Sequence, residues 1–539
     1  MSSSFWEKYA GWVLVGVSLV VGLWFINQPY VTFTDELLFE EASWRMADGE
    51  GWLVPRLHEA PWLEKAPGYF WITGGVFKIL SLTPLPVMDL TQSLDENNIY
   101  EYAFVRRVVT VVASSVVMGM TYLIAKELWD WRYGLAAGVI MLASALYLFT
   151  PLSASLDMTS TAWMCVSIWG YLRYIKAGDK TTSKESVNHS QMLRADQDDA
   201  ATDNWKWALV MGVSLAGAVM TRSVLGLTPL AVIVVDQSIR IIRGSVGRMR
   251  MWDAVWGMGI FALLVIPWHW YMWEQFGTEW LNTYLGFNVV ARTTGVIDGY
   301  ADRSWGYFLW RLVVMTPGWV LSLVLLGSWL LHYLYKSPIE VGKAMNVIGL
   351  GSVDKFEMTG ISVPETVRVI LLWLLIPLVI FSMSATRLDW YAVQLLPSLA
   401  VLGSVIGIWL FEWFCKPESR GIKRYLIEIF GIAILLTPML TLFLYQGTQA
   451  APVQAMTDLL KVTDKDAVVY AYKRAYLPNT LLYHPRQTEI MTKEGLEVLG
   501  RETTNYMFVT AIEYKEVESA RPDAEVWREY NGGLVYVFR

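Results

Sequence analysis

The sequence predicts a polytopic α-helical membrane protein, on the grounds of its composition and its hydropathy pattern. Hydrophobic residues make up 54% of the 539 residues and charged residues only 17%, whereas soluble domains carry about 25% charged residues. Apolar runs of about 17–25 residues recur along the chain, and each is long enough to cross a bilayer as a helix. We therefore expect about 11–13 transmembrane helices. The candidate spans lie near residues 10–27, 106–125, 133–150, 158–175, 205–221, 223–241, 254–272, 306–334, 367–384, 389–413 and 424–446.

Three segments are not membrane: residues 177–204, a second cytoplasmic loop at 337–365, and residues 447–539. Residues 28–105 form a long loop after the first span, and residues 177–204 contain no aromatic residue, which is typical of a disordered loop. Residues 447–539 carry patterns of short strands and one helix. The strand patterns are 467–472, 505–514 and 533–539, and the helical pattern is 493–501. The chain thus divides into a transmembrane domain, 1–446, and a small C-terminal α/β domain, 447–539.

Basic loops predict the orientation. Residues 239–250 and 414–424 each follow a span and carry four Lys or Arg, so both should be cytoplasmic. The N-terminus and loop 177–204 then lie on the cytoplasmic side of the inner membrane, and loop 28–105 and the C-terminal domain lie outside. Arg106 and Arg107 fall on the outer side, so either the rule is locally broken or these charges meet an anion.

Several other classes of protein are excluded. The chain has no basic domain and no Lys/Arg-rich run, so we expect no nucleic-acid partner. Cys165 and Cys415 both fall in or beside apolar runs, which argues against a disulfide framework. The first apolar run lacks a small-residue cleavage site and is interpreted as a retained span.

The first outer loop predicts two interfacial helices. Thr32 and Asp35 fit a capping box at the start of the first helix, and Gly49 and Gly51 end it. A second helix should start after Pro67. The first helix is amphipathic and is expected to lie in the membrane interface. Its apolar face is Leu38, Ala42 and Met46, and its polar face is Glu41, Arg45 and Asp48.

Charged and polar residues from seven segments fall on the outer side of the membrane in this topology. Ionisable residues are costly in a membrane and usually serve function, so their shared side predicts one polar site. The residues are Asp35, Glu36, Glu64, Lys65, Asp157, Arg222, His269, Arg292, Arg387, Asp389 and Tyr391.

Each residue also has a structural explanation. Asp35 can serve as a helix-start charge, and Arg222 and Arg387 can reach lipid headgroups. Glu64 and Lys65 can form a surface ion pair of little energetic value. A histidine such as His269 more often packs than binds a metal, and the chain has no HExxH motif or Cys/His cluster.

The order of several motifs resembles a known superfamily. "TDE" at 34–36, "WLVPRL" at 52–57 and "LEKAPGYFW" at 63–71 are similar to motifs of GT-C class glycosyltransferases, in the superfamily of protein O-mannosyltransferases and lipid A aminoarabinose transferases. Later stretches align in order: "LDM" at 156–158, "TRSVLGL" at 221–227, "IPWHWY" at 266–271 and "FSMSATRLDWYAVQLLPSLA" at 381–400. The motifs are similar in particular to those of the aminoarabinose branch. Ala66 replaces a proline of the pattern, Arg222 a lysine, and Leu38 a basic residue, so we assign the chain to the superfamily and not to that branch.

The resemblance implies a GT-C fold and an enzyme that moves a sugar from a polyprenyl-phosphate donor to a lipid, glycan or protein acceptor on the outer face of the membrane, with inversion at the anomeric carbon. It implies no organic cofactor and leaves a divalent metal as an open question. The implied catalytic residues are Asp35 and Asp157. The implied donor-phosphate ligands are Lys65, Arg222, Arg292, Arg387 and Tyr391. The supporting residues or candidate metal ligands are Glu36, Glu64 and His269.

Two other functions compete with the enzyme. A lipid transporter or flippase predicts broken helices, internal repeats and ionisable residues near the middle of the bilayer. The sequence shows no repeat, and its ionisable residues gather at one end of the spans. A non-catalytic scaffold would not need the acidic Asp35, which this chain has. The sequence thus favours the enzyme.

Overall fold

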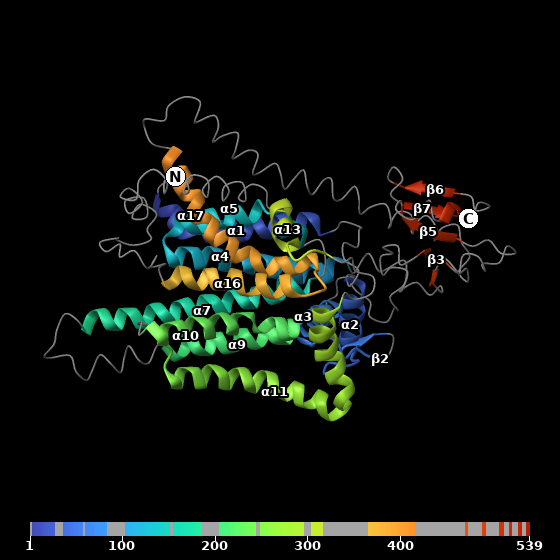
Figure 1. Ribbon diagram of the computed structural model, residues 1–539, viewed down its shortest axis with the longest axis horizontal. Helices are drawn as coiled ribbons and strands as arrows, with labels where there is room; N and C mark the ends of the chain where they lie inside the picture. Colours follow the sequence, from blue (N-terminus) through green and yellow to red (C-terminus); the bar gives the residue numbers. More distant parts are fainter. Residues whose placement is uncertain are drawn as a thin grey trace.

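The computed structural model describes most of the predicted transmembrane domain and a set of short C-terminal strands (Figure 1). The described residues are 3–26, 36–57, 60–82, 103–150, 155–185, 204–243, 248–295, 303–315, 365–414, 469–472, 488–491, 506–510, 517–519, 526–530 and 535–538. The predicted span near 424–446, residues 186–203 of the predicted loop 177–204, most of the predicted loop 337–365 and most of 306–334 lie outside this part of the chain. The start of loop 177–204 is not disordered as predicted, because residues 177–185 continue the helix that begins at Leu156.

Long helices run side by side and form the bulk of the structure (Figure 1). They are α1 Ser3–Phe25, α4 Ala103–Leu128, α5 Trp131–Leu142, α6 Ala145–Phe149, α7 Leu156–Glu185, α9 Asn204–Arg222, α10 Thr228–Arg243, α11 Met251–Leu281, α13 Tyr307–Met315, α16 Glu365–Met383 and α17 Leu396–Phe414. Shorter turns join them: the 3₁₀ turns η2 Ser223–Leu227 and η4 Asp389–Leu395, the π-helix η3 Asn282–Ala291, and α12 Arg292–Thr294. The predicted spans within the described residues are therefore confirmed as helices.

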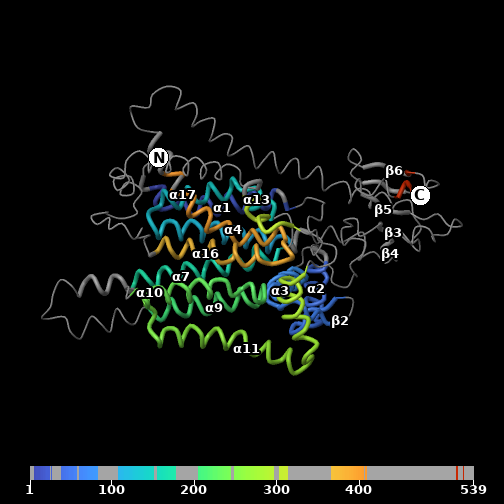
Figure 2. The backbone as a smooth tube through the Cα atoms, in the orientation of Figure 1, coloured from blue at the N-terminus to red at the C-terminus, as the bar shows by residue number. Residues whose placement is uncertain are grey.

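Five stretches of the described residues are long and apolar enough to cross a membrane. They are Phe5–Trp24, Arg107–Leu128, Asn204–Arg243, Met251–Thr294 and Thr366–Met383. Exposed large apolar side chains on α1 and α11, among them Trp12, Trp24 and Trp256, fit contact with lipid. Figure 2 shows α11 following α9 along its length. The two helices approach closely because a Cβ at Gly212 would lie only 2.2 Å from the carbonyl oxygen of Gly257.

The outer loop folds into two helices and a small hairpin at one end of the long helices. Helix α2 spans Glu36–Asp48 and α3 spans Gly68–Ser81, with a two-stranded hairpin, β1 Arg56–Leu57 and β2 Ala60–Pro61, between them. Both predicted helices are confirmed, and α2 ends where Gly49 takes a φ of 105°. The capping residues Thr32 and Asp35 lie outside the described residues.

The polar face predicted for α2 is partly wrong. Glu41 is buried, and it accepts a hydrogen bond from Arg45 Nε at 2.9 Å. Ala42 and Met46 are buried as predicted. The reason is that α2 packs against α3, so protein covers more of its circumference than a membrane interface would.

Arg107 explains one of the charges that contradicted the orientation rule. Its side chain is fully buried in α4, and its Nη1 donates a hydrogen bond to the carbonyl oxygen of Ile26 at 3.0 Å. Ile26 directly follows α1, whose C-terminal carbonyls carry partial negative charge. Arg107 is thus satisfied by the end of a helix, without an external anion.

A second buried charge cluster ties three helices together far from this end. Asp236 of α10 accepts hydrogen bonds from Arg240 Nε, Arg368 Nε of α16 and the Tyr171 hydroxyl of α7, each at 2.7 Å. Buried carboxylates persist when such donors satisfy them. The cluster holds α7, α10 and α16 in register.

The C-terminal strands form one mixed sheet of order β4-β3-β5-β7-β6. Its strands are β3 Val469–Tyr472, β4 Thr488–Met491, β5 Tyr506–Thr510, β6 Val526–Tyr530 and β7 Val535–Phe538. The three predicted strands are confirmed. Strands β4 and β6 were missed because each has only four or five residues and includes charged ones. The predicted helix at 493–501 lies outside the described residues.

Candidate active site

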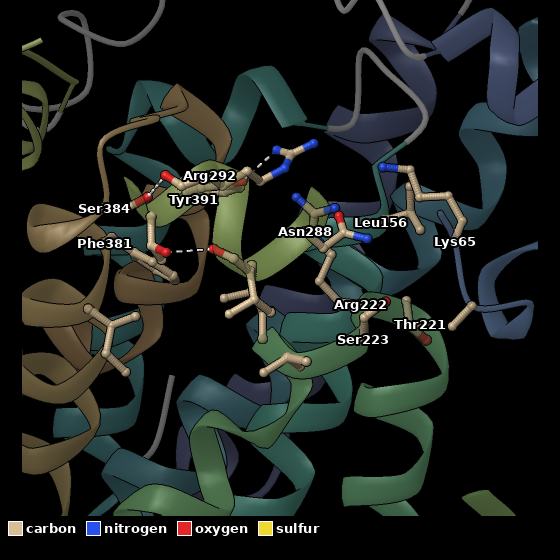
Figure 3. Close-up of a pocket in the computed structure, with 16 residues that line it drawn as sticks. Lys65, Leu156, Thr221, Arg222, Ser223, Asn288, Arg292, Phe381, Ser384 and Tyr391 are labelled. Atoms are coloured by element: carbon tan, nitrogen blue, oxygen red, sulfur yellow. Dashed lines mark hydrogen bonds between the residues drawn. The ribbon is translucent and has the colours of Figure 1, made fainter. Parts of the chain in front are cut away.

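Three cationic side chains from separate parts of the chain meet around one cavity of about 130 Å³. Lys65 comes from the turn before α3, Arg222 from the end of α9, and Arg292 from the start of α12, directly after η3 (Figure 3). Tyr391 of η4 adds a hydroxyl to the lining, and Phe381 and Ile380 of α16 supply an apolar part. The predicted convergence of these four polar residues is therefore observed.

The turn that carries Lys65 is fixed from both sides. Trp62 N donates to the carbonyl oxygen of Pro55 at 2.7 Å, and the Trp71 ring nitrogen donates to the carbonyl oxygen of Trp52 at 2.5 Å. Helix α3 begins directly after Pro67, and a Cβ at Gly68 would lie 2.6 Å from the carbonyl oxygen of Met220 in α9. A glycine is required there because the turn sits against the backbone of α9, two residues before Arg222.

Glu64 and Lys65 form a buried pair, not the exposed pair considered from the sequence. Lys65 Nζ donates to Glu64 Oε1 at 2.6 Å, and the exposed fractions of the two side chains are 7% and 19%. The ammonium also lies 5.6 Å from the centre of the Trp62 ring. Two opposite charges attract each other more strongly when they are removed from water than at the surface. We therefore expect the pair of Lys65 and Glu64 to hold the ammonium in one position.

Glu64 also connects Lys65 to Arg292. Its Oε1 lies 3.5 Å from Arg292 Nη2. Burial alone would raise the pKa of the Glu64 carboxyl, but Lys65 and Arg292 outweigh it, so the pKa lies below its ordinary value of 4.5. The carboxylate is therefore ionised at neutral pH and bridges two cations that face the cavity.

Arg222 and Asp157 form a second buried pair. Asp157 lies in the first turn of α7, and its Oδ1 accepts a hydrogen bond from Arg222 Nε at 2.9 Å. The guanidinium lies 5.6 Å from the centre of the Tyr391 ring. Ser223, the next residue, takes a φ of 56°, a left-handed conformation that is rare outside glycine and recurs at functional sites. Arg222 is thus held inside the protein and does not extend to lipid headgroups.

Arg292 is held by its own helix end and by the loop that carries Tyr391. Its Nη1 donates to the Tyr391 hydroxyl at 2.8 Å. Its carbonyl oxygen accepts from Ser384 Oγ at 2.7 Å and from Thr386 N at 3.0 Å, which satisfies a helix C-terminus that would otherwise lack partners. The stretch 381–400 therefore supplies Tyr391 to the cavity and also caps the helix of Arg292.

Five of the predicted site residues that the structure describes are not part of the cavity lining: Glu64 and Asp157, which bind its cations, and His269, Arg387 and Asp389. Arg387 donates from Nε and Nη2 to the carbonyl oxygen of Ser382, at 3.2 and 3.1 Å, and from Nη1 to that of Arg303. Asp389 accepts hydrogen bonds from Arg303 Nη1 at 2.9 Å and Arg311 Nη2 at 3.1 Å. Both residues therefore support the loop that presents Tyr391, and phosphate binding by Arg387 stays a prediction.

His269 packs among aromatic rings. Its Nδ1 lies 2.9 Å from the carbonyl oxygen of Val265 and its Nε2 lies 3.3 Å from the Tyr284 hydroxyl, with Trp268 and Trp280 around it. Among the described residues, no three His, Cys, Asp or Glu side chains gather as metal ligands do. A divalent metal, with ligands from Glu36, Glu64 or His269, thus stays a prediction.

Asp35 lies outside the described residues, and of Glu36 only the backbone, at the start of α2, is described. Their roles stay predictions. Among the lining residues that the sequence did not predict is Asn288 of η3, whose Nδ2 donates to the carbonyl oxygen of Glu64 at 2.8 Å. Its signal was its place four residues before Arg292, close to one helical turn, in an outer segment already singled out.

Comparisons with known proteins agree with this architecture. Residues 86–278 match the family described as dolichyl-phosphate-mannose-protein mannosyltransferase. The chain is 22% identical over 409 residues to the undecaprenyl phosphate-α-4-amino-4-deoxy-L-arabinose arabinosyl transferase of Pseudomonas paraeruginosa. That match covers 74% of this chain and only 59% of the relative's length.

Solved structures show the same fold. ArnT from Cupriavidus metallidurans bound to undecaprenyl phosphate superposes with a TM-score of 0.58 at 13% identity, over 98% of both chains. The apo oligosaccharyltransferase of Archaeoglobus fulgidus gives 0.55 at 11% identity, over 96% of this chain and 72% of that one. The chain is therefore a polytopic membrane protein of GT-C fold, and the resemblance stated from its motifs is confirmed.

Proposed function

We propose that the protein is a membrane glycosyltransferase that moves a sugar from a polyprenyl-phosphate donor to a lipid, glycan or protein acceptor. The observation that carries the proposal is the meeting of Lys65, Arg222, Arg292 and Tyr391, from four separate segments, around one cavity at an end of the helices. A cluster of cations beside an apolar wall suits a phosphate on a lipid chain. The relative from Pseudomonas paraeruginosa is named for an undecaprenyl-phosphate donor, and ArnT from Cupriavidus metallidurans, which has this fold, is bound to undecaprenyl phosphate.

The chemistry follows from the leaving group. Phosphate leaves the anomeric carbon readily once its developing charge is held, so it needs fixed cations and no general acid. Lys65 and Arg292 supply such cations from one side of the cavity and Arg222 from the other (Figure 3). Attack by the acceptor from the opposite face of the sugar in a single displacement would invert the anomeric carbon.

The acceptor determines whether a base is required. A hydroxyl acceptor must lose its proton, and Asp35 is the acidic position that the superfamily motif assigns to this task. A phosphate acceptor has no such need, and Asp35 would then orient it. We assign Asp157 a different role from the catalytic one predicted: its carboxylate orients Arg222, to which it is bonded at 2.9 Å.

The proposed location is the outer face of the inner membrane, with the N-terminus cytoplasmic and the C-terminal domain extracytoplasmic. In Figure 1 the C-terminal strands lie beyond the end of the bundle that carries α2 and α3, and the N-terminus lies toward the other end, which supports this orientation. A reporter fused after Arg539 should be extracytoplasmic, and one inserted in 177–204 should be cytoplasmic. A cytoplasmic C-terminus would contradict the orientation.

The test of the function is direct. The full chain, purified in lipid nanodiscs, should bind undecaprenyl phosphate, and an Arg222→Ala/Arg292→Ala variant should lose this binding. Mass spectrometry of surface glycans and lipids from a deletion strain should then show one missing sugar, which identifies both sugar and acceptor. Wild-type binding by the double variant would contradict the proposal.

A further inference from the structure

The Asn288 side chain connects the backbone segment that carries Lys65 to the helix that leads into Arg292. Its Nδ2 donates to the carbonyl oxygen of Glu64 at 2.8 Å and to that of Tyr284 at 3.1 Å. Both partners are carbonyl oxygens and can only accept, so the orientation of the amide is fixed by its chemistry. The side chain thus joins the turn before α3 to η3, the helix that leads into Arg292.

The contact acts on Lys65 because of the geometry of the peptide unit. The carbonyl oxygen of Glu64 belongs to the planar peptide group that ends at the Cα of Lys65. A hydrogen bond that fixes this oxygen fixes the plane from which the Lys65 side chain starts. Figure 3 shows Asn288 between Arg222 and Lys65 at the cavity.

The helix that carries Asn288 has an unusual geometry that allows its side-chain amide to make these hydrogen bonds. Residues Asn282–Ala291 form a π-helix, a wide and uncommon helix that recurs at functional sites. Its backbone hydrogen bonds skip to the fifth residue, so carbonyl oxygens tilt from the axis and can take a second donor. Tyr284 O takes the Asn288 amide in this way, which locks the amide toward Glu64.

We propose that Asn288 is a positioning residue that sets the separation of Lys65 and Arg292 for the donor phosphate. The inference rests on the proposed function. The Glu64 carboxylate alone would leave this separation variable, because its contact with Arg292 is long, at 3.5 Å, and is made through flexible side chains. The Asn288 amide adds a short bond to the main chain.

The experiment is a double-mutant cycle on binding of undecaprenyl phosphate by the full chain in nanodiscs. Asn288→Ala should weaken binding about tenfold, the size expected for one or two buried hydrogen bonds. In the Lys65→Ala background, which keeps Arg222 and Arg292, the same change should weaken binding less than about twofold. Asn288→Leu keeps the bulk of the side chain and should reproduce the result if the alanine variant folds poorly.

Thr283→Val is the matched control. Thr283 lies on the same π-helix but is not part of the cavity lining, and its hydroxyl donates to the carbonyl oxygen of Glu279 at 2.9 Å, so its loss should leave binding unchanged. Equal weakening by Asn288→Ala in both backgrounds, or none in the wild type, would overturn the inference and leave the proposed function standing. Failure of the wild type to bind undecaprenyl phosphate would overturn the proposed function itself.

Discussion

The buried pair of Arg222 and Asp157 predicts that stability and activity can be separated. Arg222→Ala would leave the carboxylate of Asp157, which is 4% exposed, without its bonded cation. Removing one partner of a buried pair costs about 3–5 kcal/mol. The Asp157 carboxylate can instead take up a proton, which at pH 7 costs about 4 kcal/mol for a carboxyl of ordinary pKa near 3.9. The loss of stability therefore cannot exceed about this value. We therefore expect a loss of about 3–4 kcal/mol in the free energy of unfolding.

A second substitution should restore the stability alone. Asp157→Asn in the Arg222→Ala background removes the unpaired charge, so the double variant should melt at a higher temperature than Arg222→Ala. Binding of undecaprenyl phosphate should stay weak in both, because the cation is absent. Asp157→Asn alone should reduce transfer about 10- to 100-fold, the value of a charge-assisted hydrogen bond that orients Arg222.

Thermal unfolding in nanodiscs and lipid binding by the four proteins measure the cycle. A double variant that melts no higher than Arg222→Ala would show that Asp157 is not left as an unpaired charge. If Asp157→Asn abolished transfer and left lipid-phosphate binding unchanged, Asp157 would act on the acceptor as a base, and the orienting role would be wrong.

Three further predictions test the remaining charges. Lys65→Ala should cost roughly 2–4 kcal/mol of transition-state stabilisation, or two to three decades in transfer rate, with partial rescue by Lys65→Arg, and wild-type turnover would exclude Lys65. Asp35→Asn should lower transfer to a hydroxyl acceptor by roughly two to four decades while donor binding and melting temperature hold, and a loss of only a few-fold would make Asp35 a helix cap. Because the pKa of Glu64 lies below 4.5, its contribution to stability should be complete at neutral pH and lost as the pH falls below 4.5. Glu64→Gln should remove that acid-dependent part of the melting curve, and an unchanged curve would contradict the lowered pKa.

The sequence could predict which residues share a side of the membrane, because alternating spans assign every loop to one side. This alternation predicts that Lys65, Arg222, Arg292 and Tyr391 lie on one side of the membrane, and in the structure all four line one cavity. It could not predict which side chains face the cavity. Arg387 lies in the irregular residues 384–388 between α16 and η4, where no helical or strand period decides direction, so it could not be distinguished from Arg292 as a cavity residue.

The sequence also could not predict which elements pack against one another. The π-helix that orients Asn288 has no established sequence pattern, and the packing of α2 depends on α3, which lies beyond a hairpin in the chain. Local periodicity reports one face of one helix. It does not report a second helix that covers another face, as α3 does for α2.

The carboxylates among the cations follow from the charge that the proposed reaction creates. The donor phosphate carries one negative charge as a diester and gains a second as the bond to the sugar breaks. Three cations, Lys65, Arg222 and Arg292, are paired with two carboxylates, Glu64 and Asp157. These five side chains carry one net positive charge, which balances the single negative charge of the donor phosphate. The two carboxylates hold the cations in place, so no reorganisation is needed when the second charge forms. Interactions that strengthen in the transition state raise the rate, whereas three unpaired cations would bind donor and released lipid phosphate too tightly.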